Sequence, residues 1–138
     1  MAAKTLLTPP KHAPGDKVAV SLMSGLYRMK SEAVNYNSTS PLSVFVAPIN
    51  TLILGVIVHI STAWNGAIPS LILGASGATN RHVDAADVDI KTAGFYPVWR
   101  PFEYTAITSI IATLVASTAT QGKAYIWALY APLSNETR

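Results

Sequence analysis

From residue 33 onward the sequence alternates short apolar runs with turn-forming residues, and this alternation constrains the fold more than any other feature. The runs are rich in β-branched residues, as strands are. The strands expected are 33–36, 42–46, 52–61, 70–73, 105–116 and 123–130, with a short one at 88–90 inside a loop-rich stretch at 78–104. Short strands separated by Gly, Pro and Asn turns predict an all-β fold, a jelly-roll-like β-sandwich of about seven or eight strands.

The turns predict how these strands are connected. Trp64-Asn65-Gly66 is a strong signal for a tight turn, and 74–77 closes the strand before it. The segment 117–122 is expected to be the loop of a terminal β-hairpin. In its second strand both faces are apolar, which is typical of a strand buried on two sides. One face holds Tyr125, Trp127 and Leu129, and the other holds Ala124, Ile126, Ala128 and Tyr130.

The N-terminal part differs from this body. Residues 1–32 are interpreted as an N-terminal arm and lead-in, and 33–138 as a single β-sandwich domain. The arm proper, 1–16, contains three prolines, whereas 17–34 fits a helix or a strand. The net charge of +3 arises within the first 40 residues, because the remaining residues balance. Lys4, Lys11 and Lys17 are therefore expected to bind a partner.

The composition favours a chain that buries part of its apolar surface in an oligomer. Only 12% of the residues are charged, against about 25% in an average soluble domain, and 50% are hydrophobic. A small monomer of this kind would struggle to cover its surface with polar groups, so an oligomer is expected, with a homotrimer as the leading form. The longest apolar run, 52–58, is far shorter than the about 20 residues of a membrane-spanning helix. The start of the chain reaches Pro9-Pro10 before a signal-peptide core could form, so neither a targeting segment nor a membrane partner is expected.

The candidate catalytic and metal-binding residues do not form a recognisable site. Asp84, Asp87 and Asp89 lie close to His82, but they lack EF-hand spacing and are interpreted as loop caps. Gly74-Ala75-Ser76-Gly77-Ala78 misses the last position of a nucleophile elbow. His59 lies within an apolar run, where an interior or interface role is expected. The chain has no cysteine. No catalytic residue, cofactor or metal is therefore predicted, and the chain is not expected to be an enzyme.

Aromatic side chains supply the other candidate partner-binding residues. These are Trp64, Phe95, Tyr96, Trp99 and Phe102. They are interpreted as interface anchors, and a platform for glycans or bases remains an alternative. Nucleic acid is not an expected partner, because the cations of the arm are spread out and include no arginine cluster.

Several segments between residues 33 and 131 resemble small structural proteins encoded near tailed-phage capsid genes. They are 56–66, 73–81, 86–89, 92–94, 107–114 and 120–125, followed by Tyr130. The resemblance implies a capsid decoration, or cement, protein: a jelly-roll or sandwich trimer seated at threefold junctions of the coat shell. It also implies that the major capsid protein is the partner, and that the chain is made in the host cytoplasm and resides on the virion surface. A phage fibre or tail accessory protein that binds host glycans through an aromatic loop, 95–104, is the alternative.

Overall fold

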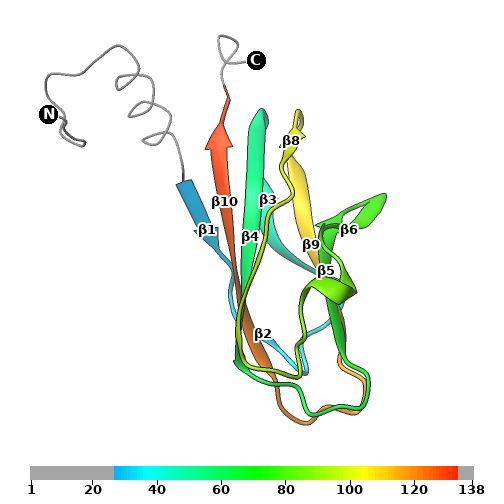
Figure 1. The fold of residues 1–138 in the computed structure, drawn as a ribbon. Helices are drawn as coiled ribbons and strands as arrows, with labels where there is room; N and C mark the ends of the chain where they lie inside the picture. Colours follow the sequence, from blue (N-terminus) through cyan, green and yellow to red (C-terminus); the bar gives the residue numbers. More distant parts are fainter. Residues whose placement is uncertain (1–26, 134–138) are drawn as a thin grey trace, which may run out of the picture.

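Two antiparallel sheets lie face to face in the computed structural model of the chain, which describes residues 27–133 (Figure 1). Sheet A contains β1 (Tyr27–Lys30), β2 (Val34–Asn35), β4 (Thr51–Thr62), β7 (Gly94–Val98), β8 (Phe102–Tyr104) and β10 (Lys123–Pro132). Sheet B contains β3 (Leu42–Ala47), β5 (Ser70–Ala75), β6 (Ala78–Val83) and β9 (Thr108–Val115). The predicted all-β, jelly-roll-like sandwich is confirmed.

The structure has more strands than the sequence predicted, because the stretch 78–104 is not mainly loop. It holds β6, β7 and β8, together with a 3-10 turn, η1 (Ala85–Asp87). β6 carries polar residues toward solvent and therefore shows little apolar alternation. β7 contains Pro97, which an edge strand tolerates because its outer N–H would have no partner in the sheet. The strand expected at 88–90 is absent, although Val88 and Ile90 are buried.

Most consecutive strands lie in different sheets, and this corrects two predicted turns. β4 belongs to sheet A and β5 to sheet B, so Trp64-Asn65-Gly66 lies in a crossing loop rather than a tight hairpin. β9 and β10 also lie in different sheets, so the predicted terminal hairpin does not form and 116–122 crosses between the layers. β5 and β6 do form a hairpin, and its turn at Gly77 has a φ of +85°.

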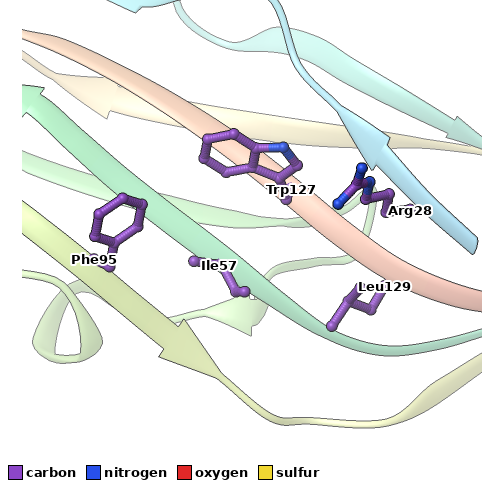
Figure 2. A pocket seen from close by; sticks show the side chains of 5 residues that line it. All are labelled: Arg28, Ile57, Phe95, Trp127 and Leu129. Carbon is purple, nitrogen blue, oxygen red and sulfur yellow. The ribbon is translucent and has the colours of Figure 1, made fainter.

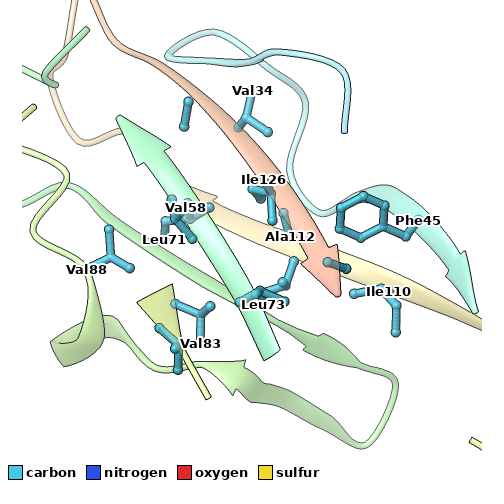
Figure 3. Close-up of a cluster of buried hydrophobic side chains, with 14 of the residues drawn as sticks. Val34, Phe45, Val58, Leu71, Leu73, Val83, Val88, Ile110, Ala112 and Ile126 are labelled. Carbon is cyan, nitrogen blue, oxygen red and sulfur yellow. The ribbon is translucent and has the colours of Figure 1, made fainter. Parts of the chain in front are cut away.

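The core fills the space between the two sheets (Figure 3). Val56, Val58 and Ile60 point inward from β4, as their alternation predicted. The inward residues of the other central strands meet them: Ile126 from β10, Ile110 and Ala112 from β9, Leu71 and Leu73 from β5, and Phe45 from β3. These side chains form one continuous apolar layer between the sheets. Its burial stabilises the fold by about 25 cal/mol per Å² of apolar surface.

The segment before residue 33 contributes a strand to sheet A. Tyr27–Lys30, in the region assigned to the lead-in, pairs with β10 in the register Tyr27↔Tyr130 and Lys30↔Trp127. The arm 1–16, with Lys4 and Lys11, and also Lys17, lies outside the described residues. Between residues 27 and 133, no helix is long and apolar enough to span a membrane.

Candidate functional site: an aromatic face on sheet A

The outer face of sheet A is lined by apolar and aromatic side chains in cross-strand rows. Strand register aligns Tyr125, His59 and Phe95 in one row, Lys30, Trp127, Ile57 and Pro97 in a second, and Arg28, Leu129 and Gly55 in a third. Directly opposed side chains on one face of a sheet contact one another. We call this surface, which also includes Trp99, the aromatic face.

β10 presents different environments on its two sides. Ala124, Ile126 and Ala128 are fully buried in the core. Tyr125 and Trp127, on the other side, are only partly buried and belong to the aromatic face. The expectation that this strand is covered on both sides is therefore not met within a single chain, and the sheet has an outward apolar face in place of a second core.

A stack of rings stiffens one end of the aromatic face. The His59 imidazole lies parallel to the Phe95 ring, with centroids 4.1 Å apart and planes 8° apart. Tyr125 and Trp127 lie within 6.3 Å and 6.0 Å of the same imidazole. His59 is thus an outward ring and not an interior residue. Phe95 remains 66% exposed even in this stack, so a large aromatic surface is left to contact a partner.

A shallow hollow lies in the middle of the aromatic face. Its volume is about 230 Å³, and Figure 2 shows the side chains around it. They are Ile57, Phe95, Trp127 and Leu129, with Arg28 as the one charged side chain lining it. The neighbouring Lys30 Nζ lies 4.7 Å from the Tyr125 ring centroid and 5.2 Å from that of Trp127. The hollow therefore has an apolar floor and a cationic edge along β1.

Trp99 extends the aromatic face beyond the end of β7. It is 58% exposed. Its ring lies against Gly55 on β4, where a Cβ atom would overlap the indole. A glycine at this position lets the tryptophan lie on the sheet rather than stand away from it, which explains the absence of a side chain in an otherwise apolar strand.

A second cluster of polar and aromatic side chains lies where β6 faces β8. His82 Nε2 is 2.6 Å from the Tyr104 hydroxyl, and the Arg81 guanidinium lies 3.8 Å from the Phe102 ring centroid. Burial, together with the nearby charges of Arg81 and Arg100, lowers the pKa of His82 to about 4. His82 is therefore held as a neutral, buried hydrogen-bonding residue.

The aspartates of 84–89 act as caps, as the sequence suggested. The Asp84 side chain accepts a hydrogen bond from the Ala85 amide, and the Asp84 amide donates to Asp87. That amide and the Arg100 guanidinium, which forms an ion pair with Asp87 at 2.6 Å, lower the pKa of Asp87. Asp89 accepts hydrogen bonds from Lys91 N and Thr92 Oγ1. No group of three His, Asp or Glu side chains within 27–133 is placed to hold a metal ion.

The structure separates the aromatic residues that the sequence grouped as anchors. Phe95 and Trp99 lie on the aromatic face, whereas Tyr96 points to the other side of β7 and donates to the Thr92 carbonyl. Phe102 lies under Arg81, in the second cluster. Trp64 is 1% exposed and belongs to the core, so it offers no surface to a partner. The stretch 95–104 is thus two strands and not a single aromatic loop.

Sequence reasoning missed most of the aromatic face. Ile57, Trp127, Leu129 and Arg28 line the hollow, but none of them was predicted to bind a partner. The sequence did contain a signal for this face, because the period-2 patterns of β4 and β10 are apolar on both sides of the strand. That pattern alone does not show whether the second face meets another layer of the same chain.

The described histidines are not arranged for hydrolysis. Within residues 27–133, neither His59 nor His82 forms a hydrogen bond with a serine or an aspartate. Ser76 is exposed in the β5–β6 turn. The surface that the structure offers is an exposed aromatic one with a cationic edge.

Comparison with solved structures relates this fold to phage capsids. The chain resembles one in the acid-stable capsid of Helicobacter pylori bacteriophage KHP30, with a TM-score of 0.65 and 15% identity over 79% of this chain and 89% of that one. It also resembles one in the capsid asymmetric unit of cyanophage Pam1, with a TM-score of 0.60 and 20% identity over 96% of this chain and 100% of that one. The fold is shared with phage capsid chains. No family model and no curated protein matches the sequence.

Proposed function

We propose that this chain is a structural protein of a tailed-phage virion, which binds the outside of the capsid as an oligomer and stabilises it by bridging coat subunits. The single observation that carries the proposal is the shared fold, because the match extends over most of both chains in each pair. Both matched chains are therefore close in length to this one. A chain of this size is a small component of a shell.

The surface of the molecule supports a binding role for the chain. The aromatic face presents Phe95 and Trp99 with more than half of each side chain exposed. Exposed aromatic residues beside an apolar hollow are typical of protein interfaces, where a few such anchors supply most of the affinity. Copies seated together on a lattice would add their individually weak contacts.

Glycan binding through the segment 95–104 is not favoured. A sugar platform requires aromatic rings that share one exposed surface. Here the aromatic residues of the segment do not form one platform: Phe95 and Trp99 lie on the aromatic face, whereas Tyr96 points to the other side of β7 and Phe102 packs under Arg81.

The proposal is tested by reconstitution on particles. Particles produced from a phage genome with this gene deleted are incubated with the purified full chain, pelleted, and heated until DNA is released. We expect the chain to cosediment with the particles at a saturating stoichiometry and to raise the temperature of DNA release. Particles from the intact genome serve as the control for full occupancy. Absence of cosedimentation, with no change in release temperature, would contradict the proposal.

A further inference from the structure

We propose that the aromatic face is occupied by a second copy of this chain, whose acidic 84–89 turn seats on the hollow beside Arg28. The contact joins two different surfaces, so repetition of it generates a ring when the rotation between successive copies closes. This self-association requires no capsid. Its failure can therefore be distinguished from failure of the proposed function.

The charge at the hollow defines what can bind there. Arg28 lines the hollow and Lys30 lies over the Tyr125 and Trp127 rings, and both cations are exposed. Glu32, just beyond the end of β1, is also exposed. The floor of the hollow is apolar. A complementary surface therefore has a small apolar tip flanked by carboxylates.

Face-to-face packing of two aromatic faces does not satisfy this requirement. In a twofold arrangement, Arg28 and Lys30 of one copy would lie against the aromatic face of the other copy, which carries the same two cations. Like charges brought together at an interface are unfavourable. The partner surface must therefore be a different part of the second copy.

The 84–89 turn of this chain has the required chemistry. The 3-10 turn η1 exposes the methyl groups of Ala85 and Ala86 at its tip. The carboxylates of Asp84 and Asp89 are exposed on either side of it. Asp87, bound to Arg100, anchors the turn to the segment between β7 and β8. The turn is thus preformed, and docking it requires little reordering of its backbone.

Strand β1, which carries Arg28, and the 84–89 turn lie on opposite sides of one molecule. In Figure 1, β1 forms the left edge of the sandwich, while β6 and the short helical turn that follows it lie on the right. When β1 of one copy contacts the turn of the next, each of these two copies keeps its other surface free for a further neighbour. The contact can therefore repeat around a closed ring, which agrees with the trimer expected from composition.

Cross-linking provides the direct test, because the chain has no cysteine. Two single-cysteine variants of the full chain, Ala86→Cys in the turn and Leu129→Cys at the hollow, are mixed and treated with a short bismaleimide. We expect a cross-linked pair that contains one chain of each variant. Ser109→Cys, on the exposed outer side of sheet B, replaces Leu129→Cys as the matched control and should give no pair with Ala86→Cys. Circular dichroism and thermal unfolding establish that each variant is folded.

A charge exchange checks the same contact without cross-linking. Arg28→Glu should weaken self-association in sedimentation velocity by at least about tenfold, as loss of an interfacial charge pair does. Lys123→Glu, at the far end of β10, makes the same charge change and should have little effect. Combining Arg28→Glu and Ala85→Lys in one chain should restore assembly, because every contact of the ring then carries both exchanges.

Three results would overturn the proposal. They are a monomeric full chain at tens of micromolar, equal cross-linking of Ala86→Cys to Ser109→Cys, and unchanged assembly of Arg28→Glu. A monomer in which Arg28→Glu reduces cosedimentation with capsids would assign the aromatic face to the coat protein instead.

Discussion

His82 links the stability of the sandwich to pH. Its pKa is lowered from 6.5 to about 4 in the folded chain, since burial disfavours the charged imidazole. Between these two values the unfolded chain binds the proton and the folded chain does not. The contribution of neutral His82 is therefore fully present above about pH 6.5 and is lost as the pH falls toward 4. From the size of the pKa shift, the loss amounts to about 3 kcal/mol.

This dependence is measured by urea unfolding between pH 4 and 7. His82→Gln retains a group that can hydrogen-bond Tyr104 but does not titrate, so its free energy of unfolding should change less over the same range. Equal pH dependence in the two proteins would show that other groups are responsible.

Gly122 makes room for the largest side chain of the core. Its φ is +153°, and a Cβ atom there would overlap the indole of Trp64, which is buried. We expect Gly122→Ala to lower the free energy of unfolding by about 1–3 kcal/mol, as overpacking does. Gly77→Ala is the matched control, because Gly77 also has a positive φ but has open space around it. Thermal unfolding should show the larger loss for Gly122→Ala, and equal losses would argue against the overlap.

At the scale of elements, local patterns identified strands better than they identified pairing. The alternation of Val56, Val58 and Ile60 located β4 and its inward face correctly. The Asn65-Gly66 pair, in contrast, resembles a hairpin turn but lies in a loop that passes from one sheet to the other. Pairing depends on which sheet each strand joins, and contacts between residues far apart in sequence decide this. The loop at 63–69 and the loop at 116–122 cross together at one end of the sandwich.

Asn65 holds these two crossing loops together. Its Oδ1 accepts hydrogen bonds from the amides of Thr120 at 2.8 Å and Gln121 at 3.3 Å, and its Nδ2 donates to Thr120 Oγ1 at 2.9 Å. We expect Asn65→Ala to lower the free energy of unfolding by about 1–2 kcal/mol, because the amides lose a shared acceptor. Asn65→Asp retains that acceptor and should lose less. Chemical denaturation of the three proteins measures the difference, and an unaffected Asn65→Ala would contradict this role.

The site was predicted less completely than the fold, because it too depends on how strands far apart in sequence are arranged. Phe95 and Trp99 were expected to meet a partner, and the structure places both on the aromatic face. Trp127 and Leu129 were assigned to a strand covered on both sides, because an apolar outward face and an apolar inward face have the same sequence pattern. Only the order of strands in the sheets distinguishes them. Trp64 showed the opposite error, as a core residue taken for an anchor.

At the scale of the whole molecule, we predict that the arm serves attachment and not folding. All buried core residues of the described part lie between Val34 and Ala128. Deletion of residues 1–16 should therefore leave the melting temperature nearly unchanged. The truncated protein should be retained on capsids less well than the full chain. Retention of the full chain should depend more steeply on salt than retention of the truncated protein, because Lys4 and Lys11 supply charge that salt screens. A truncated protein that unfolds, or that binds as tightly as the full chain at every salt concentration, would contradict this prediction.

The measurement that tests the central proposal most directly is a cryo-EM reconstruction of the purified phage particle whose genome encodes this chain. A role in stabilising the capsid predicts density for the two-sheet sandwich on the outer surface of the shell, in contact with more than one coat subunit and repeated over the lattice. Density for the sandwich confined to the tail or its fibres, or a particle without the chain, would contradict it.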